Sequence, residues 1–166
     1  MQGAIHTGTP SYLEARSEFQ KAHARARLLD VFDRLLRRCR RLYALTDVAV
    51  KSVSGGCPRV AAGPTQTRLI PGPRRLVEDV LLERVVGSLG RADDYTADFL
   101  PRRGSDEERW ARVRVALDSL EGVPPIELYQ VGADYYVKDG HHRVSVMKRM
   151  GLRHVEAYVT RLVPVG

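Results

Sequence analysis

The segment whose residue types and spacing could bind an anion is Asp139-Gly140-His141-His142-Arg143. Residues 135–138 before it are aromatic and β-branched, as strands prefer, and residues 144–150 after it read as a helix that stops at Gly151. A strand, a tight glycine turn and a helix start bring free backbone N–H groups and the positive end of the helix dipole together. Phosphate is the usual ligand of such a site, and Arg143 adds a planar cationic fork. Asp-Gly is also an ordinary turn dipeptide, so a turn that binds nothing stays an alternative.

The two histidines of this turn could also act as proton carriers, because imidazole titrates near neutral pH. Adjacent side chains on a helix point about 100° apart, so His141 and His142 are not expected to share one metal ion. At least one of them is expected to pack or to form a hydrogen bond. The sequence supplies no cluster of carboxylates for two-metal cleavage, and we expect no metal site.

The segments around this turn resemble the ParB/sulfiredoxin superfamily over about half of the chain, residues 76–163. The matching pieces occur in order: a leading segment at residues 80–88, a helix at 106–120, a Val-Pro-Pro-Ile strand at 123–129, the turn at 136–143 and a last strand at 155–159. The resemblance implies a mixed α/β fold, a small sheet with packed helices that follows a long basic N-terminal helix.

What this resemblance implies for function is a nucleotide, ATP or CTP, whose phosphates are held at the turn, with magnesium carried on the phosphates. Residue by residue, Gly140, His141, His142 and Arg143 would contact phosphate, and Asp139 would brace the turn or lie near a metal-bound phosphate. If a nucleotide binds, Ser88 is expected to donate a hydroxyl hydrogen bond. Further arginines lie in the segment that similar proteins fold over the nucleotide: Arg91, Arg102 and Arg103.

The chain also departs from the members of this superfamily. Sulfiredoxins carry a cysteine where His141 stands, so sulfinic-acid reduction is not expected. Free-serine kinases carry an acidic base in the leading segment, for which Glu83, Asp93 and Asp94 are only neighbouring substitutes. The DNA-reading domain of partition proteins would follow the last strand, and this chain ends at Gly166.

Two functions from different classes therefore stay open. The first is a nucleotide-binding switch or adaptor with weak or no hydrolysis of the nucleotide. This switch could also associate with DNA. The second is a small-molecule kinase or another phosphotransferase, with Glu83, Asp94 and His142 as candidate catalytic residues. A carboxylate that points into the pocket beside Arg143 would favour the kinase, and a pocket of arginines and histidines would favour the switch.

Composition limits the choice further. A chain of 166 residues with a net charge of +7 favours anionic partners such as nucleotides or nucleic acid, although a coding bias toward arginine would give the same charge. Cys39 and Cys57 lack the spacing of a zinc site or of a disulfide framework. No apolar run follows Met1, so we expect neither a signal peptide nor a membrane span, and a cytoplasmic location.

The N-terminal part, residues 1–50, is expected to form a basic amphipathic helix. Ser11 and Glu14 predict a capping box, and the helix is expected to reach Tyr43. An apolar stripe recurs at helical spacing: Leu28, Phe32, Leu35, Cys39 and Leu42. This helix could pack on its own domain, pair with a second copy as a homodimer, or place its arginines on nucleic acid.

The rest of the chain divides into a linker and an α/β domain. Residues 51–75 are rich in proline and glycine and predict a linker or loop without regular elements. Residues 76–166 form the expected nucleotide-binding domain. Within it, Ser105 and Glu108 predict a second capping box, before a helix that buries Trp110.

Overall fold

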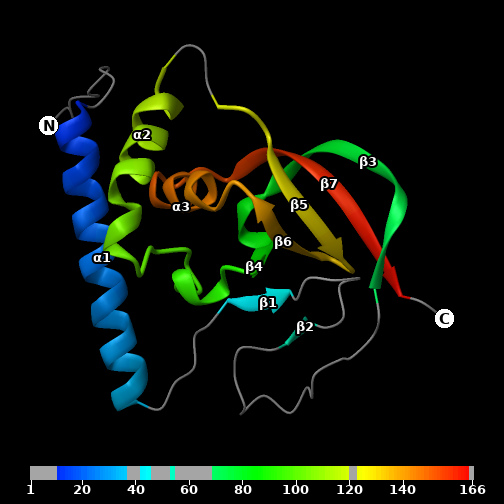
Figure 1. The fold of residues 1–166 in the computed structure, drawn as a ribbon, viewed down its shortest axis with the longest axis horizontal. Helices are drawn as coiled ribbons and strands as arrows, with labels where there is room; N and C mark the ends of the chain where they lie inside the picture. The colour runs from blue at the N-terminus through cyan, green and yellow to red at the C-terminus, as the bar shows by residue number, and fades with distance from the viewer. Residues whose placement is uncertain (1–10, 37–41, 46–52, 55–68, 120–122, 165–166) are drawn as a thin grey trace, which may run out of the picture.

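The computed structural model describes residues 11–36, 42–45, 53–54, 69–119 and 123–164. Its architecture is mixed α/β, as the sequence predicts (Figure 1). The helices are α1 (Tyr12–Leu35), α2 (Glu107–Leu117) and α3 (His141–Arg149), with short 3-10 turns η1 (Leu82–Arg84), η2 (Ala92–Asp94) and η3 (Gly104–Asp106). The strands are β1 (Tyr43–Leu45), β2 (Val53–Ser54), β3 (Leu69–Leu81), β4 (Val85–Leu89), β5 (Ile126–Val131), β6 (Asp134–Asp139) and β7 (His154–Pro164).

The strands form one mixed sheet in the order β2-β1-β4-β6-β5-β7-β3. The pairs β1–β4, β4–β6 and β5–β7 are parallel, and the other neighbours are antiparallel. α3 packs on the sheet through Val144 and Met147, α2 lies on α3, and α1 lies outermost along α2 (Figure 1). None of the described helices combines the length and the apolar character that crossing a bilayer needs.

The capping box at the start of α1 is confirmed. The Ser11 amide donates to Glu14 Oε2 at 2.7 Å, and the Glu14 amide donates to Ser11 Oγ at 3.3 Å. The expected end of this helix is wrong, because α1 ends at Leu35 and Tyr43 belongs to β1. Pairing of β1 with β4 overrides the local helical pattern there.

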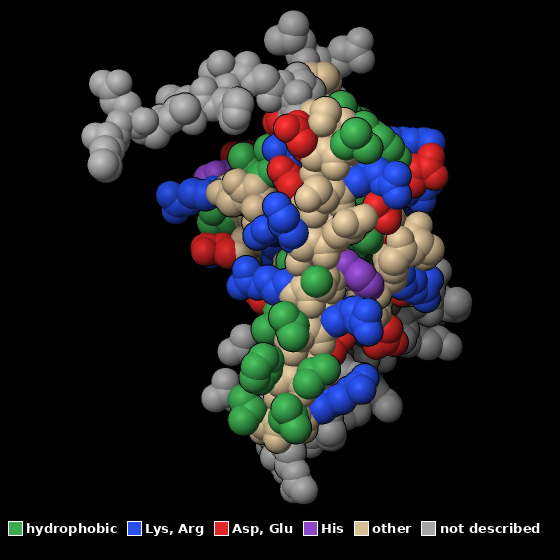
Figure 2. Space-filling model, turned by 90° about the vertical axis from the view of Figure 1, so that its left-hand side faces the viewer, with side chains coloured by type: hydrophobic (Ala, Val, Ile, Leu, Met, Phe, Trp, Pro, Cys, Tyr) green, Lys and Arg blue, Asp and Glu red, His purple; other side chains and the backbone are tan. Residues whose placement is uncertain are grey.

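The face of α1 that packs on the protein is not the leucine stripe. Small residues and one aromatic are buried instead, at a four-three-four spacing: Ala15, Phe19, Ala22 and Ala26. Phe19 meets Trp110 of α2 edge to face, with ring centroids 5.8 Å apart. The C-terminal half of α1 and its C-cap carry exposed apolar residues: Leu28, Val31, Phe32, Leu35 and Leu36. Figure 2 shows hydrophobic side chains gathered at the lower end of this face. Cys39 lies outside the described residues.

The prediction of an irregular segment at residues 51–75 is wrong near both of its ends, since β2 occupies Val53–Ser54 at the start. β3 begins at Leu69 and runs through Pro71, with a register irregularity between Pro71 and Arg75. Because β3 lies at the edge of the sheet, a residue without an N–H group is tolerated there. Residues 55–68 are outside the described ranges, and the division of the chain into three parts stays a prediction.

The second predicted capping box does not form. The 3-10 turn at Gly104–Asp106 shifts the helix start, so Asp106 takes the N-cap position of α2 without a side-chain hydrogen bond. The expected burial of Trp110 is confirmed; its side chain is fully enclosed and its Nε1 donates to Ser145 Oγ at 3.0 Å. This bond and the ring packing join α1, α2 and α3 into one layer.

Candidate functional site

The turn between β6 and α3 has the geometry that the sequence predicts. Gly140 is the N-cap of α3 and has a φ of 98°, a conformation that disfavours any side chain. A Cβ atom at this position would lie 2.5 Å from Ile126 Cγ2 of the neighbouring strand β5. Glycine is therefore required both by the backbone angle and by the close approach of β5.

Three backbone donors are free at the start of α3. The first helical bond runs from the Val144 amide to the Gly140 carbonyl, at 3.0 Å. No acceptor among the described residues receives the amide N–H groups of His141, His142 and Arg143. Amides arranged in this way at the positive end of a helix dipole form a site for an anion.

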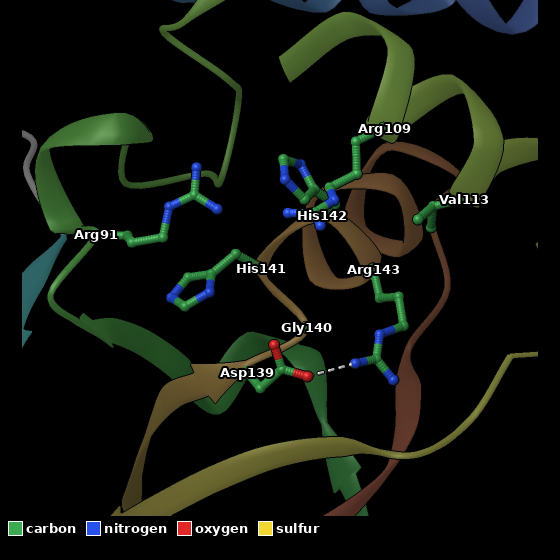
Figure 3. A pocket seen from close by; sticks show the side chains of 8 residues that line it. All are labelled: Arg91, Arg109, Val113, Asp139, Gly140, His141, His142 and Arg143. Atoms are coloured by element: carbon green, nitrogen blue, oxygen red, sulfur yellow. Dashed lines mark hydrogen bonds and ion pairs between the residues drawn. The ribbon is translucent and has the colours of Figure 1, made fainter. Parts of the chain in front are cut away.

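A cavity of about 260 Å³ lies at these amides, beyond the carboxyl ends of the parallel neighbours β4 and β6. Figure 3 shows the side chains around it: Arg91, Arg109, Val113, Asp139, Gly140, His141, His142 and Arg143. Arg91 comes from the segment after β4, and Arg109 comes from α2. The space beyond the carboxyl ends of parallel strands is where ligands bind in open α/β sheets.

His141 is a buried, neutral member of this lining. Its Nε2 lies 2.7 Å from Ser88 Oγ of β4. Burial, and then the charge on Arg91, lowers the pKa of His141 to about 4. Ser88 itself is fully buried and does not line the cavity, so it reaches a ligand only through His141.

His142 carries an unsatisfied buried nitrogen. Its Nδ1 lies 3.2 Å from the Tyr95 hydroxyl, whereas its Nε2 has no hydrogen-bond partner in the described structure. Asp106 Oδ1 lies 3.9 Å from His142 Nε2. Burial lowers the pKa of His142, and the charges on Arg91 and Arg109 act in the same direction. A buried polar atom that lacks a partner is costly, which suggests that a ligand completes it.

Arg143 is held by its own chain. Its Nη1 donates to the carbonyl oxygens of Pro124 and Pro125, and its Nη2 donates to Asp139 Oδ2 at 2.8 Å. The guanidinium therefore fastens the segment before β5 to the turn. Contact between Arg143 and a bound phosphate stays a prediction.

The other arginines near the turn differ in whether a carboxylate of the chain already neutralises their charge. Arg91 is bound by Asp94 at 2.7 Å and by Asp106 at 3.2 Å. Arg103 also pairs with Asp94, and Arg102 pairs with Asp30 of α1, so neither lines the cavity. Arg109, in contrast, is exposed and has no ion-pair partner among the described residues.

Sequence reasoning missed Arg109. It lies in the first turn of α2, and only the packing of α2 on α3 brings it to the turn at Gly140. No motif marks it, and its charge is one of many on this chain.

The candidate catalytic carboxylates lie outside the cavity. Glu83 is an exposed residue of η1, and Asp94 is buried between Arg91 and Arg103. Only Asp139 among the lining residues is acidic, and it is paired with Arg143. In the described part of the chain, no group of three or more His, Cys, Asp or Glu residues could hold a metal ion.

Comparison with known proteins gives one distant likeness. No protein-family model and no curated protein matches the chain. Among solved structures, the crystal structure of sulfiredoxin from Arabidopsis thaliana aligns with a TM-score of 0.40 and 16% sequence identity, over 52% of this chain and 85% of that one. A TM-score and an identity this low carry no argument about function.

Proposed function

We propose that this chain binds the phosphate groups of a nucleoside triphosphate, ATP or CTP, in the cavity at the start of α3, with magnesium carried on the phosphates. The observation that carries the proposal is the convergence of three unpaired amides and the unpaired Arg109 on one cavity, whose lining includes His142 with its enclosed and unsatisfied Nε2. Each of these groups donates hydrogen bonds or carries positive charge, which suits phosphate oxygens.

The size of the cavity suits part of a nucleotide. Ligand pockets commonly measure about 300–1,000 Å³, and this one measures about 260 Å³. Phosphate groups fit within that volume, whereas the base would lie largely outside it. We therefore expect weak discrimination between ATP, CTP and GTP.

Binding with weak or no hydrolysis fits the lining better than phosphoryl transfer does. A kinase of the free-serine type needs a carboxylate base near the outer phosphate. Asp139 is the acidic residue of the lining, and its carboxylate is engaged by Arg143 at 2.8 Å. The protein is accordingly proposed to act as a nucleotide-responsive switch or adaptor.

Nucleic acid is the proposed partner of the switch. Arg25, Arg27 and Arg34 are exposed residues of α1. This helix lies on the side of the molecule away from the sheet (Figure 1), and Figure 2 shows Lys and Arg side chains on that face. Cations arranged along a helix can bind phosphates of a nucleic-acid backbone irrespective of sequence. The proposed contact predicts salt-sensitive binding of duplex DNA that Arg27→Ala weakens.

The nucleotide site is tested by calorimetry with ATP, CTP, GTP and inorganic pyrophosphate, with and without magnesium. Arg109→Ala should weaken binding about tenfold or more, because a charge-assisted hydrogen bond is lost. Arg112→Ala is the matched control: Arg112 is exposed on the same helix but pairs with Glu108 and does not line the cavity. Failure of all four compounds to bind, or equal weakening in both variants, would refute the site.

Formation of nucleoside diphosphate, measured with and without an acceptor, separates the two functions. The switch predicts formation that is slow and independent of added acceptors such as free serine. Diphosphate formation that requires a small-molecule acceptor, with the phosphoryl group recovered on that acceptor and not as inorganic phosphate, would favour the kinase instead.

A further inference from the structure

We propose that Ser88 and Tyr95 are positioning residues that hold His141 and His142, both of which line the cavity, as opposite neutral tautomers, so that each ring carries its N–H donor on the nitrogen away from the positioning hydroxyl. His141 carries its proton on Nδ1, and His142 carries its proton on Nε2. This inference rests on the proposed function and limits the ligand that the two rings bind to an oxyanion. Both rings offer hydrogen-bond donors and no lone pair for a metal ion.

The assignment for His141 follows from the contacts of the Ser88 hydroxyl. Ser88 Oγ accepts the Arg91 amide N–H at 3.2 Å, and its own proton has two acceptors within reach. His141 Nε2 lies at 2.7 Å, and the Leu89 carbonyl oxygen lies at 3.4 Å. A separation of 2.7 Å is typical of a hydroxyl donor, so the proton goes to Nε2.

A neutral imidazole with an accepting Nε2 carries its hydrogen on Nδ1. Burial lowers the pKa of His141 to about 4, so the ring is neutral at physiological pH. Figure 3 shows the His141 ring between Arg91 and Asp139, next to Gly140, and its Nε2 is taken by Ser88. The Nδ1–H group thus lies beside the free amides at the start of α3.

The assignment for His142 follows from the Tyr95 hydroxyl. Tyr95 is fully buried, and in the described structure its hydroxyl has His142 Nδ1 as its hydrogen-bond partner, at 3.2 Å. Burial raises the pKa of Tyr95, which therefore keeps its proton. Donation to Nδ1 is the arrangement that leaves no buried hydroxyl hydrogen unpaired.

The proton of His142 is then on Nε2, the atom that has no partner in the described structure. Its residue is 93% buried, because only 7% of its surface is exposed. Nε2 is enclosed, so this N–H group gains an acceptor when the side chains around it move to admit a ligand oxygen. Inorganic pyrophosphate supplies such oxygens without a sugar or a base.

Nuclear magnetic resonance of the full chain tests the tautomers directly, because the nitrogen shifts of a histidine ring distinguish Nδ1–H from Nε2–H. We expect Nδ1–H for His141 and Nε2–H for His142 at pH 7 without ligand. Ser88→Ala and Tyr95→Phe should each shift the tautomer of their own histidine. The matched controls are Ser119→Ala, at an exposed hydroxyl, and Tyr135→Phe, at a buried ring, both away from the cavity.

Binding of inorganic pyrophosphate supplies the second measurement. Ser88→Ala and Tyr95→Phe should weaken it between about two- and tenfold, and the controls should stay within twofold of wild type. His141→Asn places an amide nitrogen near the position of Nδ1 and should retain more affinity than His141→Gln, which reaches toward Ser88.

Each outcome decides a distinct statement. A proton on the other nitrogen of either ring, or a charged ring at pH 7, overturns the inference. If Ser88→Ala and Tyr95→Phe leave the histidine tautomers unchanged, Ser88 and Tyr95 are not positioning residues. Correct tautomers in a protein that binds neither pyrophosphate nor any of the three nucleotides overturn the proposed function and the role of the donors in binding, while the hydrogen-bond assignment stands.

Discussion

Mild acid should destabilise the fold through His141, and replacing this residue should remove that part of the pH dependence. The ring is buried against β4, with Nε2 at 2.7 Å from Ser88 Oγ. Its pKa falls from 6.5 to about 4, chiefly because of burial. Between these pH values His141 binds a proton in the unfolded chain but stays neutral in the native state.

The sign and the size follow from linkage. The pKa is depressed in the fold, so the contribution to stability is fully present above pH 6.5 and is lost as the pH falls toward 4. The difference between the two pKa values corresponds to about 3 kcal/mol in the free energy of unfolding. Other groups titrate in the same range, so the quantity to measure is the difference between two proteins.

The assay is urea unfolding of wild type and His141→Asn at several pH values between 7.5 and 4. Asparagine does not titrate, and its amide retains a hydrogen-bonding group at this position. Wild type should lose about 3 kcal/mol more than the variant over that interval. Parallel pH profiles for the two proteins would refute the buried, neutral assignment of His141.

Three further predictions concern the turn and the helical layer. Gly140→Ala should lower the free energy of unfolding by about 3 kcal/mol in urea titrations, because its Cβ meets Ile126 and its φ is positive. Arg143→Ala should lower the free energy of unfolding by about 2 kcal/mol in the same assay, because two proline carbonyls and Asp139 lose their donor. Unchanged stability would instead indicate that Arg143 serves ligand binding and not the fold. Phe19→Ala should cost about 3–5 kcal/mol and expose Trp110, which its fluorescence would report; an unshifted spectrum would argue against the packing of α1 on α2.

The parts of the structure that the sequence predicts well are those fixed by neighbours in the chain. Gly140 between a β-branched run and a helix marks a strand-turn-helix, and Ser11 with Glu14 marks the start of α1. Both depend on backbone donors and acceptors a few residues away. The turn at the centre of the candidate site belongs to this class.

The parts that the sequence does not predict depend on tertiary contacts. Tyr43 continues a helical pattern and yet pairs with β4, because a parallel neighbour is available only in the folded chain. The alanines that pack α1 on α2 carry little hydrophobic signal, whereas Leu28, Phe32 and Leu35 of the stronger stripe are exposed and Leu42 at its end is buried outside α1. Arg109 enters the cavity, and Ser88 reaches His141, by the same long-range packing.

The position of β7 has a consequence for how the protein is made. β7 follows every other described element in the chain, and yet it lies inside the sheet, between β5 and β3. The long strand β3 pairs only with β7 among the described strands. Synthesis proceeds at about 5–20 residues per second, so several seconds pass between the synthesis of β3 and that of β7. During this time both edges of β3 are unpaired. Nascent chains of this protein should therefore depend on chaperones until synthesis has passed Pro164.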